Sequence, residues 1–212
     1  MGNNKKKRRV RSDVPYAIRL QMEQVAAIRN VRDYSAKIIM LCHACALHEL
    51  HGKGYASLVR FSLHFKELVD EFYDKDDAGL ELARKRLAQH DVVVEPGIPV
   101  YVVPGLTPRD QQQFDHGVQA AYFAHLIALI TENDVFSHGK EKLEATSVKV
   151  EELKVRFRKE GEKFLRDYLE GVGFPIIDGK VTACLDEEDK PVSYKRYLEM
   201  QGRAEVRGNS EE

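Results

Sequence analysis

The densest group of potential metal ligands is the run Cys42-x-x-Cys45-x-x-His48-x-x-His51. Cysteine thiolates and histidine nitrogens are the usual ligands of tetrahedral zinc. Residues three apart on a helix are separated by about 300° around its axis, so four side chains at this spacing do not converge on one ion. Cys42 and Cys45 also fall on an apolar stripe, where thiols behave as small hydrophobic side chains. We therefore predict core packing for the two cysteines, with a zinc site as the alternative, and we expect no cofactor.

A second candidate for chemistry is a tripeptide that occurs twice, at His51-Gly52-Lys53 and at His138-Gly139-Lys140. Glycine N–H groups and a lysine at the start of a helix can hold a phosphate. The spacing of a P-loop is not met, because no Ser or Thr follows Lys53. The sequence therefore allows two interpretations: a small-ligand site at these six residues, or a repeated signal that ends a helix.

Motifs for nucleophilic or metal-dependent hydrolysis are missing from the sequence. The chain has no Gly-x-Ser-x-Gly and no His-Glu-x-x-His, and His48-Glu49-Leu50-His51 is one residue short of the latter. Catalytic triads also assemble from residues far apart in a sequence, so these motifs do not exclude an enzyme. We expect a non-enzymatic protein and assign no catalytic residue.

Residues 1–11 carry the strongest functional signal and are called the basic arm below. The arm has no acid and six cations, which are Lys5, Lys6, Lys7, Arg8, Arg9 and Arg11. Such a block can neutralise phosphates and release their counterions, which gives salt-dependent binding to nucleic acid without sequence preference. Three further cations, Arg84, Lys85 and Arg86, lie in a predicted helix. The alternatives for the arm are a solubilising tail and a segment that binds a protein partner.

The net charge of the whole chain hides the difference in charge between the basic arm and the rest of the chain. The 212 residues contain 33 Lys and Arg and 34 Asp and Glu, which gives a net charge of -1. Without the six cations of the arm, residues 12–212 hold 27 cations and 34 anions, a net charge of -7. Because an acidic body repels a phosphate backbone, we expect nucleic-acid contact at the arm and, to a lesser degree, at residues 84–86.

Composition excludes several broad classes of protein. A hydrophobic fraction of 43% is enough for a core and argues against wholesale disorder. No apolar run approaches the roughly 20 residues that span a bilayer, so we expect no membrane contact. Three cysteines do not make a disulfide framework, and no apolar segment follows the charged N-terminus as in a secretory signal. These features predict a cytoplasmic protein and leave its oligomeric state open.

Turn residues divide the chain into two similar units. In the first unit we predict helices at about 14–50, 55–73 and 77–89, followed by a β-hairpin of strands 92–94 and 98–103. In the second unit, Thr107 and Pro108 start a helix that ends near Ser137, and two further helices follow. Ser147 is a point at which the first of these could split. Asp178-Gly179 then forms the turn of a second hairpin within residues 174–185.

We therefore predict a mainly α fold with small β-hairpins (α+β), made of two units of one design. The expected divisions are a disordered segment at 1–13 that contains the basic arm, the first unit at 14–105 and the second unit at 106–186. An acidic linker, a short helix at 193–200 and a flexible tail make up 187–212. Three helices followed by a hairpin is also the element order of a winged helix, in which the third helix enters the DNA major groove.

Three segments of the first unit form a recognisable pattern: the stretch 46–54, Leu58-Val59-Arg60-Phe61 and the acidic pair Asp76-Asp77. This pattern resembles small, uncharacterised helical proteins of bacteriophages and prophages of Gram-positive bacteria. The chain departs from the usual pattern because Lys53 stands between the two glycines and Tyr55 follows them. The resemblance implies a phage protein in the cytoplasm of a bacterial host. It assigns no site residue.

These observations give three functional hypotheses. The leading one is a phage accessory protein that binds nucleic acid through the basic arm. The second is a protein-binding inhibitor or modulator of a host defence or transcription factor, with the acidic body as the contact surface. The third is a protein that binds or sequesters a small ligand such as a nucleotide, in a cleft between the units or at the His-Gly-Lys turns.

Overall fold

The computed structural model describes residues 16–73, 76–95, 107–178 and 180–208. Within these residues the chain forms seven helices and one two-stranded antiparallel sheet, which confirms a mainly α fold. The elements are α1 (Tyr16–His51), α2 (Tyr55–Tyr73), α3 (Asp76–Ala88), α4 (Pro108–Phe136), α5 (Lys140–Glu160), α6 (Glu162–Val172), β1 (Ile176–Ile177), β2 (Lys180–Val181) and α7 (Tyr194–Gly208).

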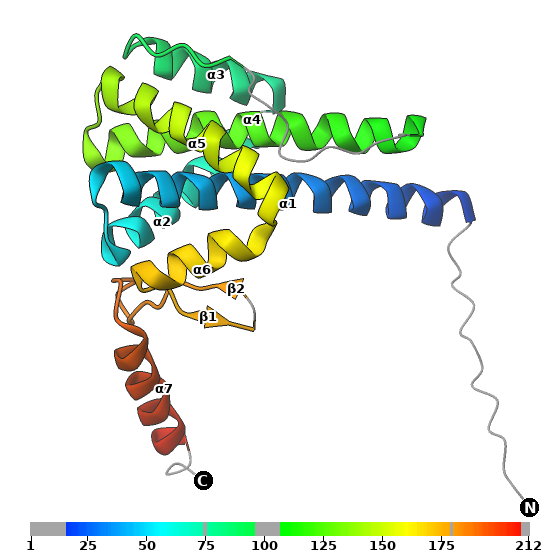
Figure 1. Cartoon of the computed structure of the whole chain (residues 1–212). Helices are drawn as coiled ribbons and strands as arrows, with labels where there is room; N and C mark the ends of the chain where they lie inside the picture. Colours follow the sequence, from blue (N-terminus) through cyan, green and yellow to red (C-terminus); the bar gives the residue numbers. More distant parts are fainter. Residues whose placement is uncertain (1–15, 74–75, 96–106, 179, 209–212) are drawn as a thin grey trace, which may run out of the picture.

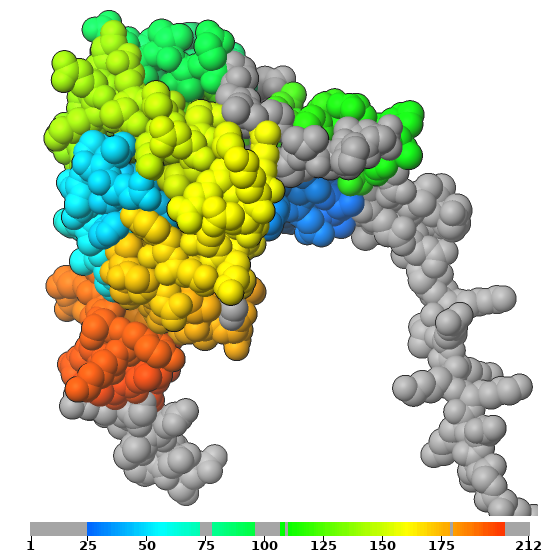
Figure 2. Space-filling model, in the orientation of Figure 1, coloured from blue at the N-terminus to red at the C-terminus, as the bar shows by residue number. Residues whose placement is uncertain are grey.

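Two long helices, α1 and α4, form the centre of the molecule. They lie side by side and run in the same direction, and their N-terminal ends project together beyond the other helices (Figures 1 and 2). Helices α2 and α3 pack on α4, whereas α5 and α6 pack on α1. Helix α4 is therefore covered mainly by the two helices that follow α1 in the chain, and α1 is covered mainly by the two helices that follow α4.

The core lies where these six helices meet, towards the C-terminal ends of α1 and α4. On α1 the apolar stripe of Cys42 and Cys45 is buried together with Ile38 and Leu41, whereas Tyr34, one turn before Ile38, is 41% exposed. The reason is that the first half of α1 extends past the covering helices (Figure 1). On α4, the buried run of apolar side chains from Leu126 to Ile130 faces the same core.

Local signals explain where the central helices begin and end. At the start of α4, the Thr107 hydroxyl accepts a hydrogen bond from the Asp110 amide, and the Asp110 side chain accepts one from the Thr107 amide. This reciprocal pair satisfies two amides that no helical carbonyl can reach. At the end of α1, Gly52 takes a φ of +60° and so stops the helix.

The second predicted hairpin is present and is attached to α2. Strands β1 and β2 pair around a turn at Asp178, whose φ is +50°. The Tyr55 hydroxyl accepts a hydrogen bond from the Cys184 amide at 2.8 Å and donates one to the Cys184 carbonyl at 3.3 Å. The start of α2 therefore holds the segment that follows the hairpin.

Three details of the prediction are wrong. Residues 92–95 form no strand; Tyr122 donates to the Val94 carbonyl at 2.7 Å, so a side chain takes the place of a strand partner. The other half of that hairpin, 98–103, lies outside the described residues. Helix α5 continues through Ser147 without a break, and α7 runs to Gly208 rather than ending near residue 200.

None of the described helices combines the length and the apolar character that crossing a bilayer requires.

Candidate functional site

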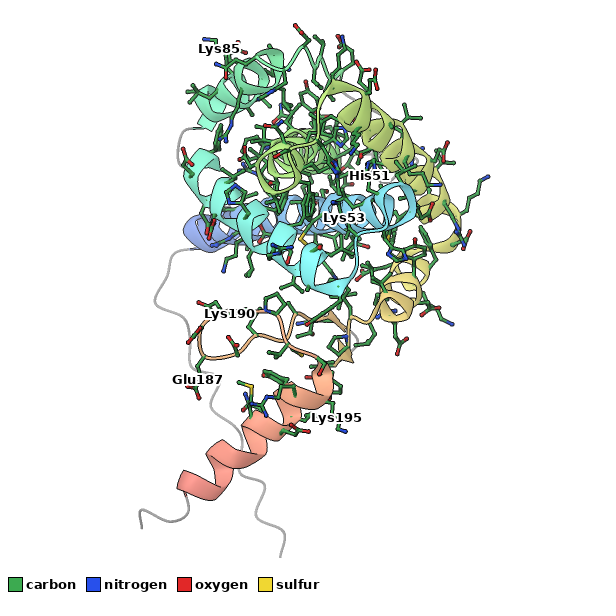
Figure 3. The ribbon with its side chains drawn as sticks, turned by 90° about the vertical axis from the view of Figure 1, so that its left-hand side faces the viewer. His51, Lys53, Lys85, Glu187, Lys190 and Lys195 are labelled. Atoms are coloured by element: carbon green, nitrogen blue, oxygen red, sulfur yellow. The ribbon has the colours of Figure 1, made fainter. Side chains whose placement is uncertain are left out.

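The cations predicted to contact nucleic acid fall into two groups. Lys5, Lys6, Lys7, Arg8, Arg9 and Arg11 lie outside the described residues. On α3, the Nη2 nitrogen of Arg86 donates to both carboxylate oxygens of Asp134 on α4, at 2.8 and 2.7 Å. Arg84 lies over the Tyr122 ring and donates to its hydroxyl at 3.3 Å. Lys85 points away from the body at the outer edge of α3 (Figure 3), so it is the member of this trio best placed for an external partner.

The four residues of the Cys-His run do not meet at one point. Cys42 and Cys45 are fully buried in the core, and burial raises the pKa of the Cys42 thiol to about 12 and that of Cys45 further. The His48 ring packs edge-on against Tyr168, while His51 faces Thr146. Among the residues that the structure describes, no three His, Cys, Asp or Glu side chains are arranged to hold a metal ion.

The two His-Gly-Lys turns do come together, at the end of the molecule where α1 and α4 finish. The rings of His51 and His138 meet edge-on with 4.4 Å between their centroids. Lys53 lies 4.3 Å from the centroid of the Phe136 ring, so it belongs to the same cluster. Figure 3 shows His51 and Lys53 near the junction of α1 and α2, far from Lys85. Gly139 precedes α5, which begins at Lys140.

The two turns have different backbone roles, which corrects the idea of a repeated helix stop. Gly52 is left-handed and ends α1. Gly139 is extended, with a φ of -78°, and begins α5 as its N-cap. The left-handed residue that ends α4 is Ser137, with a φ of +54°.

A buried chain of polar side chains lies directly behind these turns, and we call it the histidine relay. His43 Nδ1 lies 2.8 Å from Glu132 Oε1, and His43 Nε2 lies 2.8 Å from His125 Nδ1. His125 Nε2 in turn lies 2.9 Å from the Ser147 hydroxyl. The relay therefore joins α1, α4 and α5 through three consecutive hydrogen bonds.

The relay continues from Glu132 to the His-Gly-Lys turns. Glu132 Oε2 lies 3.5 Å from His138 Nδ1, a distance too long for a strong hydrogen bond. Thr146, next to Ser147 on α5, lies 3.2 Å from His51 Nε2 through its hydroxyl. His138 therefore lies between the partly exposed His51, whose ring it contacts, and the buried Glu132, which is 81 residues from His51 in the sequence.

Burial sets the protonation states of the relay. It lowers the pKa of His43 to about 3 and that of His125 well below its usual value, with Lys154 and, for His125, His43 acting in the same direction. Burial raises the pKa of Glu132 to about 7, which the His138 and Thr146 side chains partly oppose. Both imidazoles are therefore neutral near pH 7, where Glu132 is close to its midpoint.

These states fix the direction of the hydrogen bonds when Glu132 is ionised. The carboxylate only accepts, so His43 donates from Nδ1 and accepts at Nε2. His125 then donates from Nδ1 and accepts at Nε2 from the Ser147 hydroxyl. Chemically, the arrangement can pass a proton between Ser147 and Glu132. It also fixes the register of three helices, because His43, His125 and Glu132 are buried and would lose their partners in another register.

The histidine relay was not predicted from the sequence, although one signal for it exists. His43 stands between Cys42 and Ala44 in a continuous buried segment, and Glu132 follows the apolar run of α4. A polar residue at a core position requires a buried partner. The partners of His43 are His125, 82 residues away, and Glu132, 89 residues away, so only the fold brings them together.

Comparison of the chain with protein-family models, with curated proteins and with solved structures finds no match in any of the three.

Proposed function

We propose that the protein is a non-enzymatic phage accessory protein that binds nucleic acid through its basic arm in the cytoplasm of a bacterial host. The observation that carries the proposal is the separation of charge: residues 1–11 hold six cations and no acid, and the rest of the chain has a net charge of -7. The phage setting rests on the sequence resemblance in the first unit.

The contacts of α3 support a binding surface concentrated in the arm. Arg86 is held by Asp134 and Arg84 by Tyr122, with Glu81 3.7 Å from Arg84 as well. Cations that already pair with internal groups contribute less to phosphate binding than cations that face solvent. The expected affinity is therefore independent of base sequence and falls steeply with salt, with a logarithmic slope of about -5 if all six arm cations contact phosphates.

The body is proposed to be a duplicated scaffold that presents the arm. The pattern of helix contacts stays the same when α1, α2 and α3 are exchanged for α4, α5 and α6. The long helices α1 and α4 pack on each other. The two helices that follow α1 pack on α4, and the two that follow α4 pack on α1. The corresponding helices have 36 and 29, 19 and 21, and 13 and 11 residues. A winged-helix-like unit stays a prediction, and the engaged arginines on α3 favour the arm over that helix.

A gel-shift titration tests this function. The full chain, and a full-length variant in which the six arm cations are replaced by Gln, are mixed with duplex DNA and with RNA at several salt concentrations. We expect wild-type binding that weakens with salt and at least a tenfold loss in the variant. Lys66→Gln, at an exposed lysine of α2 outside the predicted binding residues, is the control and should bind as the wild type does. Equal binding by the arm variant and the wild type would refute the proposal.

A second candidate function, binding of a host protein, is favoured by one observation on α7. Tyr194 and Leu198 stand four residues apart on this helix and are 41% and 51% exposed, and α7 extends away from the body (Figure 1). An apolar pair at this spacing suits the groove of a partner protein. Leu198→Glu should abolish capture of a stoichiometric partner from host lysate, whereas Lys195→Glu on the same helix should leave it intact.

A further inference from the structure

A cavity of about 440 Å³ lies between the described helices at the projecting side of the core. Its walls come from α1 and α4, the central helices of the two units, and from α2 and α3. The volume falls within the range of about 300–1,000 Å³ that is typical of small-molecule sites. The pocket therefore lies at a junction between the two units.

Small side chains on the two central helices make room for this pocket. Ala36 of α1 and Ala120 and Ala124 of α4 line it with methyl groups, so the two helices leave space between their faces. Phe72 of α2 and Phe123 of α4 supply aromatic surface. Aromatic walls beside small residues favour a flat, apolar group, because such a group buries both of its faces.

The polar lining is biased towards hydrogen-bond donors. Arg32, His116 and Gln119 line the pocket and can all donate, whereas the carboxylate of the lining is Asp33. Asp33 lies 3.9 Å from Arg29 on the same helix, and because both side chains are mostly exposed to solvent this pair offsets the carboxylate charge only weakly. An anionic or acceptor group on a ligand would thus meet donors from both central helices.

We propose that this pocket binds a small amphipathic molecule with a flat apolar body and one anionic head group. The apolar body lies between Phe72 and Phe123 above the alanines, and Arg32 and Gln119 contact the head group. Binding would bridge α1 and α4 and so stabilise the contact between the two units. This site is separate from the basic arm and does not depend on nucleic-acid binding.

Binding of a dye with this chemistry tests the proposal on the full chain. The probe is 8-anilinonaphthalene-1-sulfonate, a flat aromatic sulfonate, and its uncharged comparison is N-phenyl-1-naphthylamine. We expect the sulfonate to bind with one molecule per chain and at least tenfold more tightly than the uncharged dye. Saturable 1:1 binding distinguishes the pocket from dye that coats exposed apolar surface, which takes up several molecules.

Two variants and one control locate the dye. Ala120→Leu fills the pocket and should weaken binding of both dyes at least tenfold, while Ala145→Leu adds the same side chain to the exposed face of α5 and should change neither. Gln119→Ala should weaken only the sulfonate, because it removes a donor without filling space. Melting temperatures of all the variants report whether the fold is kept.

The outcomes separate this inference from the proposed function. Equal affinity for the two dyes, or unchanged binding in Ala120→Leu with a wild-type melting temperature, would overturn the pocket proposal. The variant with Gln at the six arm positions should bind the sulfonate dye as the wild type does. Loss of dye binding in that variant would show instead that the dye pairs with the arm.

Discussion

His43 Nδ1 lies 2.8 Å from Glu132 Oε1, and neither side chain has any exposure to solvent. The pair connects the two central helices near the middle of the core, and His125 and Ser147 extend it to α5. Buried polar groups contribute to a unique arrangement because an incorrect register leaves them without partners. The relay therefore aligns α1, α4 and α5, and its contribution to the free energy of unfolding can be measured with variants of its residues.

The first prediction concerns the pH dependence of Glu132→Gln. Burial raises the pKa of Glu132 from its ordinary value of 4.5 to about 7 in the folded state, so the folded protein holds a proton that the unfolded chain releases between these pH values. The wild type should lose about 3 kcal/mol relative to the variant as the pH rises from 4.5 to 7. Urea unfolding of both proteins from pH 4.5 to 8 measures this difference. A constant difference would contradict the raised pKa.

The histidines of the relay act in the opposite direction in the same experiment. His43 and His125 have lowered pKa values, so the unfolded chain takes up protons on them as the pH falls below about 6.5 and the folded protein does not. Wild-type stability should consequently decrease on acidification below pH 6.5 despite the contribution of Glu132. The comparison with Glu132→Gln isolates the carboxyl because both proteins retain the two histidines.

The second prediction is that the His43–Glu132 pair is strongly coupled. His43→Leu removes the hydrogen-bond partner of both Glu132 Oε1 and His125 Nδ1 and should reduce the free energy of unfolding by about 3 kcal/mol. Adding Glu132→Leu should cost less than the sum of the two single changes, by at least about 1 kcal/mol. Denaturant unfolding of the single and double variants gives the coupling energy.

A nearby histidine provides the control for this cycle. His48→Leu, on the same helix, removes a partly exposed ring that packs on Tyr168 and should cost less than about 1 kcal/mol. Additive effects of His43→Leu and Glu132→Leu would mean that the pair contributes nothing beyond packing.

The order and limits of the helices were predictable from the sequence because their signals are local. Thr107 and Pro108 mark the start of α4, and the glycines after His51 separate α1 from α2. Each signal acts through backbone groups only a few residues away. This is why the predicted helix at 55–73 coincides with α2.

Two features that the sequence did not predict depend on residues far apart in the chain. Val92 and its neighbours have strand-forming side chains, but Tyr122 of α4 bonds the Val94 carbonyl and no strand forms. The relay is a second case, because His43 meets partners more than 80 residues away. A linear pattern shows that His43 stands in an apolar segment; only the fold shows which carboxyl it contacts.

The third prediction separates the histidines by their titration. Burial alone would lower the pKa of His64, but hydrogen bonds to Glu67 and Asp134 raise it above its usual value. In NMR spectra, His64 should titrate above pH 6.5, while His43 should stay neutral until the pH approaches about 3 or the protein unfolds. Asp134→Asn should lower the pKa of His64 and leave His43 unchanged. Titration of His43 in the folded protein near pH 6.5 would disprove its burial.

The fourth prediction uses the different backbones of the two His-Gly-Lys turns. Gly52 has a φ of +60° and Gly139 a φ of -78°, and an added Cβ at either position meets no atom within 4 Å. Steric clashes therefore do not distinguish substitutions at the two glycines, and the difference in backbone φ alone does. Gly52→Ala should cost about 1 kcal/mol because a side chain disfavours the left-handed region. Gly139→Ser should stabilise the protein by a few tenths of a kcal/mol, because serine is a better N-cap than glycine. Thermal unfolding of the two variants checks both signs, and an equal loss in the two would show that the turns share one conformation.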